Sequence, residues 1–500
     1  MGRDRHSDLS APNLLTRRSV LQRAGWVLGA AAFPLRAGLA AQSGAAQSGV
    51  SPVMTTLSTY MSAAGTRVLP AEVIEKAKRH ILDTLAAMVS GSDLAPGRVA
   101  IKFARAHSGE KVATVVGSNV LCGAIEAALA NGMLAHSDET DDSHAPSLSH
   151  PGCAVVPAAL AAAEQFGIDG VRFLRAVTLG YDVGPRVTMA MGHGIRYEGH
   201  KSTHSIAGVF GAAAAAGCAA GLNAQQMRWL LDYTAQQSSG IAAWQRDTEH
   251  IEKSFVFAGM PARSGVTAAL LVQIGATGVD DILSGADNFL LAYAPQTDPA
   301  KLVEKLGERY EITRTSIKKW TVGSPIQAPL DALDNLFKRR PFEPDQVQLM
   351  NVRVASSEAS IVDNREIPDI CLQHMMAVML VDKTASFRAA HETARMKDPA
   401  ILRQRAKVKL VYDKELERRL PAREAIVEIT LADGTRLSER VTAVRGTAEN
   451  PMSREEIAAK SRDLMTPVLG GATSAKLIET VLAIENVKDI RTLRPLLQRA

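Results

Sequence analysis

The feature that most restricts the fold is a helical apolar pattern that runs almost without interruption from Ser51 to Gly307. In PAEVIEKAKRHILDTLAAMVSG (70–91), apolar residues return every three or four positions until a glycine ends the pattern. The run IAGVFGAAAAAGCAAGL (206–222) is rich in alanine, so such helices can approach each other closely. These patterns predict an all-helical domain over residues 51–310.

The pattern changes after about Thr313. Three segments are rich in β-branched residues and partly alternate: VQLMNVRVA (347–355), KVKLVYD (407–413) and AIVEITLADGTRLSERVTAV (425–444). Asp433-Gly434 predicts a hairpin turn, and helical stretches at 325–339 and 369–380 lie between the strands. We expect a smaller α+β domain over 311–447 and, over 448–500, C-terminal helices that pack back on the helical domain, so the fold class is mainly α.

Composition excludes some classes of protein. The chain has 46% apolar residues and a net charge of +5 from 57 basic and 52 acidic residues, without a long basic run. A chain of 500 residues with this apolar content can bury a large core. This charge pattern gives no indication of nucleic-acid binding, whereas it is compatible with small anionic substrates.

The N-terminus predicts export. In TRRSVLQRAGWVLGAAAFPLRAGLAAQ, Arg17 and Arg18 precede an apolar run that ends in small residues, which is typical of a twin-arginine signal over residues 1–41, cleaved near Ala40 or Ala41. The run is shorter than the roughly 20 residues that a membrane span needs. Because no other stretch looks long and apolar enough, we expect a periplasmic protein that uses the twin-arginine machinery and leaves the membrane after cleavage.

The cysteines show no metal or redox pattern. No CxxC pair is present, and the four thiols lie in apolar surroundings: Cys122, Cys153, Cys218 and Cys371. Twin-arginine cargo folds in the reducing cytoplasm, so we expect buried free thiols and no structural zinc site made from them.

One segment concentrates the groups that carry chemistry. HSDETDDSHAPSLSHPG (136–152) holds three histidines and four carboxylates in what looks like a loop between two helices. A metal site is one interpretation, because His136 and Glu139 are three residues apart, although no HExxH or EF-hand pattern is present. Acid/base catalysis is the other, with His144 or His150 near the carboxylates Asp141 and Asp142.

Acid/base chemistry on a carboxylate also needs cations, and three segments offer them. The candidates lie beside small residues, where a ligand can approach closely: Lys201, Lys253, Arg263, Lys318 and Lys319. Each has an ordinary alternative as a surface residue. Equally, His204 could be a core or capping histidine, Asp142 a helix cap and His374 a packed core residue, and Pro151 could start the next helix.

Four segments, in this order, together resemble the MmgE/PrpD family, which includes 2-methylcitrate dehydratase, cis-aconitate decarboxylase and iminodisuccinate epimerase. They are NGMLAHSDETDDSHAPSLSHPG, STHSIAGVFGAAAAAGCAAGL, AGMPARSGVTAALLVQIGATG and IKKWTVGSPIQAPLDAL. The resemblance covers residues from about 54 to 490. It implies a large helical domain with a smaller α+β domain, a homodimer, and catalysis without metal or organic cofactor.

The resemblance implies a site between the two domains and points to six residues: Glu139, Ser143, His150, His204, Lys253 and Lys318. With the residues that their own chemistry suggests, we expect His150, Glu139, Asp142, Ser143 and His204 as catalytic groups, and Lys253, Arg263, Lys318, Asp141 and His374 as substrate-binding groups. His150 would be the base, Glu139 or Asp142 would orient it, and His204 would act as the acid.

The chain departs from the family pattern at several of these positions. Glu139 and Ser143 stand where the family usually has Asp and Thr, His374 stands where it often has Tyr, and either His200 or His204 could serve as the second histidine. The expected activity is a lyase, dehydratase-like, on a small di- or tricarboxylate. An epimerase, a decarboxylase, a non-catalytic carboxylate-binding protein and a metal-dependent hydrolase remain as alternatives.

Overall fold

The structure is a computed structural model that describes residues 49–294 and 296–499. The predicted export signal over 1–41 lies outside the described residues. The first helices carry the pattern read from the sequence, as α3 at Ala71–Gly91 shows. The helices that precede the sheet are α2 (Pro52–Ala63), α3, α4 (Ala95–Ala106), α5 (Ala124–Ala135), α6 (Gly152–Phe166), α7 (Gly170–Met191), α8 (Gly194–Tyr197), α9 (Thr203–Ala220), α10 (Ala224–Gln237), α11 (Ile251–Ser254), α12 (Met260–Gln273) and α13 (Phe289–Tyr293).

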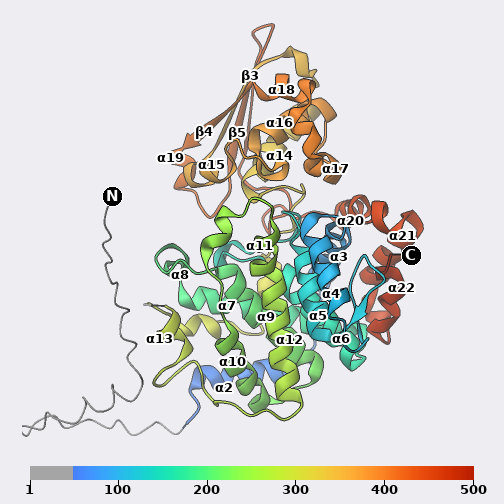
Figure 1. Cartoon of the computed structure of the whole chain (residues 1–500). Coiled ribbons are helices and arrows are strands. Elements are labelled where there is room, and N and C mark those ends of the chain that lie inside the picture. Colours follow the sequence, from blue (N-terminus) through green and yellow to red (C-terminus); the bar gives the residue numbers. More distant parts are fainter. Residues whose placement is uncertain (1–48, 295, 500) are drawn as a thin grey trace, which may run out of the picture. The chain divides into compact units, whose positions relative to one another are not determined.

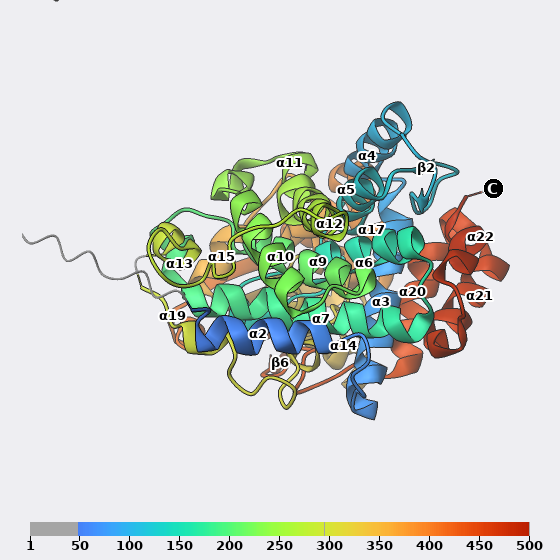
Figure 2. The ribbon, with the colours of Figure 1, turned by 90° about the horizontal axis from the view of Figure 1, so that it is seen from below.

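Helix α9 is the centre of the helical part. It contacts α6, α7, α10 and α12, and Figure 2 shows it between them. The small residues of α9 make this packing close, because a Cβ atom on Gly211 would lie 2.8 Å from the carbonyl oxygen of Gly180 on α7. The alanine-rich sequence therefore forms the core of the bundle. The domain is not purely helical, since a two-stranded sheet pairs β1 (Ala113–Thr114) with β2 (Leu121–Cys122).

The strands form where the sequence predicts them. They are β3 (Val347–Ala355), β4 (Val408–Asp413), β5 (Ala425–Leu431) and β6 (Arg436–Val441), in the order β4-β3-β5-β6. β3 runs parallel to β4 and antiparallel to β5, while β5 and β6 form the hairpin whose turn contains Gly434 at φ 82°. The helices of this part are α14 (Ser324–Arg339), α15 (Ser356–Val362), α16 (Leu372–Asp382), α17 (Phe387–His391), α18 (Pro399–Arg405) and α19 (Lys414–Glu417), and Figure 1 shows α14 and α16 beside the sheet.

The buried apolar residues form two clusters. One joins residues from 54 to 317 with residues 452–497, and the other takes residues 320–444. The C-terminal helices α20 (Arg454–Leu469), α21 (Gly471–Leu482) and α22 (Arg494–Leu497) belong to the first cluster, and α20 and α21 both contact α3. The predicted mainly α fold with a smaller α+β part is confirmed, whereas the domain boundaries stay predictions.

The expectation that no later segment is long and apolar enough to cross a bilayer was wrong. Among the described residues, the stretches Thr203–Ala220 and Ile251–Gln273 reach that length and hydropathy. The most apolar window of the first is 94% buried inside the fold and that of the second 67%. A helix that is apolar on all its faces can lie in the core of a protein as well as in a membrane, so buried core helices reach the same length and hydropathy.

Three cations from distant parts of the chain hold the loop between α5 and α6, which we call the acidic loop (residues 136–151). His391, at the end of α17, lies 2.9 Å from Asp138. Lys318 donates to the carbonyl of Glu139 at 2.7 Å, and Lys460 of α20 donates to the carbonyl of Thr140 at 3.1 Å. The acidic loop is thus the place where the α+β part and the C-terminal helices meet the helical part.

The close contact between α7 and α9 predicts a steric effect. Replacing Gly211 with leucine should lower the stability by about 1–3 kcal/mol or more, because its side chain would overlap α7. Thermal unfolding of Gly211→Leu and Gly471→Ala measures this effect. A Cβ atom added at Gly471 would have no neighbouring atom within 4 Å, so Gly471→Ala should melt as the native protein does. Equal melting temperatures for both variants would contradict the packing described.

The His391–Asp138 pair predicts a pH-dependent stability. The Nδ1 atom of His391 donates to the carbonyl of Phe387 at 2.7 Å, and its Nε2 atom faces the carboxylate, so the ring is favoured as a cation. Although burial lowers the pKa of His391, Asp138 and Asp369 outweigh it and raise that pKa to about 9. Burial raises the pKa of Asp369 to about 7.

A folded-state pKa above the unfolded value means that the contribution of His391 is complete below about pH 6.5 and is lost as the pH rises to about 9. The melting temperature of the native protein should fall over this window more than that of His391→Gln, which has no such proton to lose. Parallel melting curves for the two proteins across the window would show that His391 is not held as a cation.

Candidate functional site

The acidic loop buries four carboxylates in the helical part of the fold. Asp141 and Asp142 are 0% exposed, Asp138 is 4% exposed and Glu139 is 6% exposed. An ionised carboxylate at such a depth is tolerated only with partners of opposite charge or hydrogen-bond donors. The partners of each carboxylate therefore define what the loop can do.

Asp142 anchors the loop. It contacts His80 at 2.7 Å and accepts hydrogen bonds from the Tyr181 hydroxyl at 2.5 Å and from the amide of Gly152 at 2.9 Å. Gly152 is the first residue of α6, so Asp142 caps this helix, which was the ordinary alternative for the residue. Its neighbours leave it no contact with His150.

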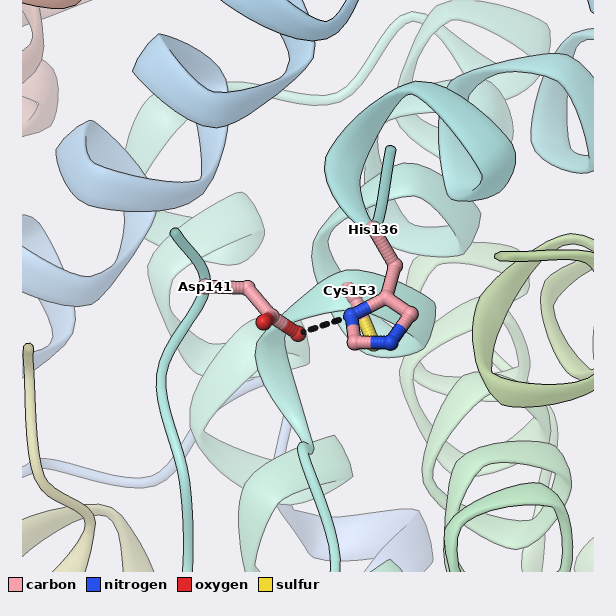
Figure 3. A group of neighbouring side chains, drawn as sticks. All are labelled: His136, Asp141 and Cys153. Carbon is pink, nitrogen blue, oxygen red and sulfur yellow. Dashed lines mark ion pairs between the residues drawn. The ribbon is translucent and has the colours of Figure 1, made fainter. Parts of the chain in front are cut away.

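Asp141 holds two imidazole rings. The Nδ1 atom of His150 lies 3.1 Å from Oδ1, and the Nδ1 atom of His136 lies 3.0 Å from Oδ2 in a geometry too bent for a hydrogen bond (Figure 3). Burial alone would raise the pKa of Asp141, but His136, His150 and Lys318 lower it well below its usual range. The expectation that Glu139 or Asp142 orients His150 is therefore wrong, since Asp141 makes this contact.

Glu139 pairs with both lysines that the sequence suggested. Lys253 donates to Oε1 of Glu139, and Lys318 lies 3.6 Å from Oε2 and 3.7 Å from Asp141. Burial would raise the pKa of Glu139, but Lys253 and Lys318 bring it well below its usual range. Two cations thus converge on one buried carboxylate beside His150.

A wall of rings completes the site. Phe257 lies in η3 (Phe255–Gly259), a π-helical turn between α11 and α12, and π-helical turns are frequent at functional sites. It stacks on His204 at 3.8 Å and on His136 at 4.6 Å between ring centroids. His204 in turn lies 5.1 Å from His150, and Trp244 meets Phe257 edge-on at 4.7 Å.

Three histidines of this site, His150, His204 and His250, are electrically neutral at pH 7. Burial lowers the pKa of His150, and Lys318 and His136 lower it further against the opposing charge of Asp141. Burial also brings the pKa values of His204 and His250 well below their usual range, aided by His150 for the first and Lys253 for the second. A neutral imidazole can accept a proton, so His150 is a competent base.

Several residues that the sequence suggested have other surroundings. Arg263 is exposed on α12, His200 is exposed, and His374 is buried on α16, a helix that contacts β4 and α18. Burial lowers the pKa of His374 to about 4. Lys201 donates to the carbonyl of Tyr293, and Lys319 pairs with Asp334. The structure therefore does not bring these five residues to the carboxylates of the acidic loop.

Two loop residues are held by contacts outside the histidine cluster. Ser143 pairs through its backbone with Ser316. His144 contacts Ser147 at 2.8 Å and Glu311 at 3.2 Å. Their contacts fix the path of the loop.

Sequence reasoning missed some residues that contact the site. They are His80, His136 as a partner of Asp141, Tyr181, Trp244, His250, Phe257, Asp369, His391 and Lys460. Only His250 carried a usable signal, because it stands three residues before Lys253. His136 lies in the loop itself, but its spacing to Glu139 gave no sign of its contact with Asp141. The remaining residues lie too far from the loop in sequence for spacing to link them.

Two groups of described side chains offer metal-ligand atoms within 4.8 Å of one another. The first is His136, Asp141 and Cys153 (Figure 3). Burial and Asp141 raise the pKa of the Cys153 thiol well above its usual range, so this thiol stays protonated and is a poor ligand. The second is His136, Glu139 and His250. As expected, the four cysteines are free and buried.

A cleft of about 510 Å³ lies elsewhere, lined by Pro146, His193, Lys301, Arg309 and Arg314, among others. None of the predicted site residues lines it. The catalytic candidates themselves are largely enclosed, since the side chains of Lys253 and His150 are 17% and 11% exposed and those of Glu139 and Lys318 are 7% and 3% exposed.

Comparison with known proteins agrees with this architecture. The model of the MmgE/PrpD N-terminal domain matches residues 55–301, and that of the C-terminal domain matches residues 320–486. A cis-aconitate decarboxylase-like protein of Aspergillus oryzae is 25% identical over 86% of this chain and 94% of its own length. The cis-aconitate decarboxylases of Aspergillus terreus (25% identical, 89% of this chain and 96% of theirs) and Homo sapiens (26%, 85% and 90%) are similar. The chain therefore belongs to the MmgE/PrpD family, whose relatives named here are lyases.

Proposed function

We propose that the protein is a cofactor-independent lyase that acts on a small di- or tricarboxylate through a carbanion next to a carboxylate. The observation that carries the proposal is the enclosed group of Asp141, His150, Lys253 and Lys318, in which a neutral base lies beside two cations. The relatives support this class, since their names describe decarboxylation of a tricarboxylate.

Lys253 and Lys318 would bind substrate carboxylates. Each ammonium has three donors, and the described contacts use one of Lys253 on Glu139 and one of Lys318 on the Glu139 carbonyl. The remaining donors can make charge-assisted hydrogen bonds to a substrate carboxylate. In an enclosed site such bonds also stabilise the negative charge that develops when an adjacent bond breaks.

His150 would transfer the proton. Its Nδ1 atom faces Asp141, so the hydrogen lies on Nδ1 and the lone pair of Nε2 is free to take a proton from the substrate. Asp141 then stabilises the imidazolium that forms. Burial brings the pKa of His204 well below its usual range, so this ring is unprotonated at neutral pH and has no imidazolium proton to donate. We therefore assign it a hydrogen bond to the substrate instead of the role of acid.

Dehydration, decarboxylation and epimerisation all fit this chemistry. The sequence favoured a dehydratase, while the relatives favour a decarboxylase. Proton NMR in D₂O with citrate, 2-methylcitrate, cis-aconitate, malate, tartrate and iminodisuccinate, with and without a chelator, separates them. A new alkene signal from a saturated hydroxy acid indicates dehydration, conversion of cis-aconitate to a product with a new set of proton signals indicates decarboxylation, and exchange of a Cα–H alone indicates epimerisation.

Loss of turnover on addition of the chelator would contradict cofactor independence, and no change with any of these acids would favour a carboxylate-binding protein. We further propose that the protein is exported by the twin-arginine machinery and works in the periplasm as a homodimer. Cell fractionation and light scattering of the purified protein test these two proposals.

Replacing His150 with alanine should lower turnover by about 10²–10⁴-fold, because general acid/base help of this size is lost. The fold should be kept, since the described hydrogen bonds of the His150 side chain go to Asp141 alone. The measurement is kcat with the substrate identified by NMR. His107→Ala, at an exposed residue after α4, is the matched control. Native turnover in the His150 variant would remove it from the mechanism.

The pH profile should reflect the low pKa of His150. Because burial lowers this pKa, the base stays unprotonated at pH 6.5, and kcat/KM should fall only below that value. The measurement is kcat/KM between pH 5 and 8 at constant ionic strength. An acid limb centred above pH 6.5 would show that another group is the base.

A further inference from the structure

Two buried imidazole nitrogens beside Glu139 have no hydrogen-bond partner among the described residues. They are the Nε2 atoms of His136 and His250, residues that are 0% and 8% exposed. A buried polar atom without a partner is uncommon in folded proteins and calls for a ligand or another explanation. The proposed mechanism uses neither ring.

The two rings converge on Glu139. One donor atom of each of the three residues lies within 4.8 Å of those of the other two. Ligand atoms around a tetrahedral zinc ion are about 3.3 Å apart at bond lengths of about 2.0 Å, so small side-chain rotations would close the set. Two imidazoles with one carboxylate suit zinc and related transition ions, whereas magnesium and calcium prefer oxygen ligands.

The surroundings of His136 resemble those of a metal ligand. Its Nδ1 atom lies 3.0 Å from Asp141 in a geometry too bent for a hydrogen bond, and its Nε2 atom also has no hydrogen-bond partner among the described residues. Metal-binding histidines commonly donate their second ring N–H to a carboxylate, and a small rotation of this ring would complete that hydrogen bond to Asp141. Asp141 thus lies beside a potential ligand on one side and contacts the proposed base on the other.

The backbone of His250 provides a second, independent observation. This residue has φ 62° and ψ 6°, a left-handed backbone conformation that residues other than glycine rarely adopt. Strained residues of this kind cluster at ligand sites and switch regions. The turn is held by Asp247, which accepts from the amides of Glu249 at 3.0 Å and Lys253 at 2.8 Å. In this conformation the ring of His250 lies beside that of His136, with their centroids 5.1 Å apart.

We propose that His136, Glu139 and His250 bind a divalent transition ion of the zinc class, and that this ion competes with Lys253 for Glu139. Lys253 is the more exposed partner of Glu139 and can leave it. The three side chains leave a fourth position on the ion for water or a substrate carboxylate. If Lys253 binds substrate as proposed above, the ion inhibits the enzyme reversibly, and this consequence alone rests on the proposed function.

Titration of the untagged protein with Co²⁺, followed by its visible absorption, and with Zn²⁺, followed by calorimetry, tests the site without any substrate. The native protein should bind one ion. His250→Ala should bind at least 10-fold more weakly, because a ligand is lost. Lys253→Met should bind about 10-fold more tightly, because a competing cation is removed. His107→Ala, at an exposed histidine outside the cluster, should bind as the native protein does.

The opposite signs of the two substitutions separate the site from general damage to the fold. Absence of an ion at micromolar concentrations, native affinity in His250→Ala, or weaker binding in Lys253→Met would each overturn the proposal. With substrate present, turnover should fall as Zn²⁺ fills the site, and turnover that rises would overturn the competition. Because binding is measured without substrate, a failed lyase assay does not affect this result, nor does failed binding affect the lyase proposal.

Discussion

The fold depends on the pairing of four carboxylates inside one buried loop with lysines and imidazole rings. Each has its own partners, and these come from widely separated parts of the chain: His391 for Asp138, Lys253 and Lys318 for Glu139, His136 and His150 for Asp141, and His80 for Asp142. Removing a charged partner from a buried ion pair, such as Lys318 beside Glu139, typically costs about 3–5 kcal/mol. The loop can therefore be buried only when the helical part, the α+β part and the segment carrying Lys318 are all in place, so correct assembly and formation of the site are one event.

The same constraint produces the proposed chemistry. Asp141 is fully buried and lies against two different rings, so it fixes the orientation of His150 without being available to substrate. Burial keeps His150 neutral, while Lys253 and Lys318 supply positive charge nearby. A base and its electrostatic complement are then preorganised in a region of low dielectric constant, where charge interactions are stronger than in water. Phe257 restricts the rings of His136 and His204 by stacking against them.

Local pattern predicted much of the fold. The strand Val347–Ala355 and the helix Ala71–Gly91 follow from residue spacing and turn residues, because these signals act over a few positions. The position of the loop between α5 and α6 was also readable. The roles of its carboxylates were not, because Asp141 and Asp142 are adjacent and equal in chemistry. Only tertiary packing decides that Asp142 meets His80 and Tyr181, whereas Asp141 meets His150.

Long-range partners were the other limit. His391 and Lys460 stand more than 200 residues after the loop, and nothing in their local sequence marks them as ligands of its carboxylates. His374 was chosen by family position, yet its surroundings on α16 are a separate core. Resemblance to a family located the right segments, but it could not assign the contacts within them.

The central claim is that His150 is a neutral base whose hydrogen is held on Nδ1 by Asp141. Nitrogen NMR of histidine-labelled protein at pH 7, with the His150 signals identified from a His150→Gln variant, measures this directly. The account predicts one protonated nitrogen, at Nδ1, and an unprotonated Nε2. An imidazolium signal, or a hydrogen on Nε2 instead, would contradict it.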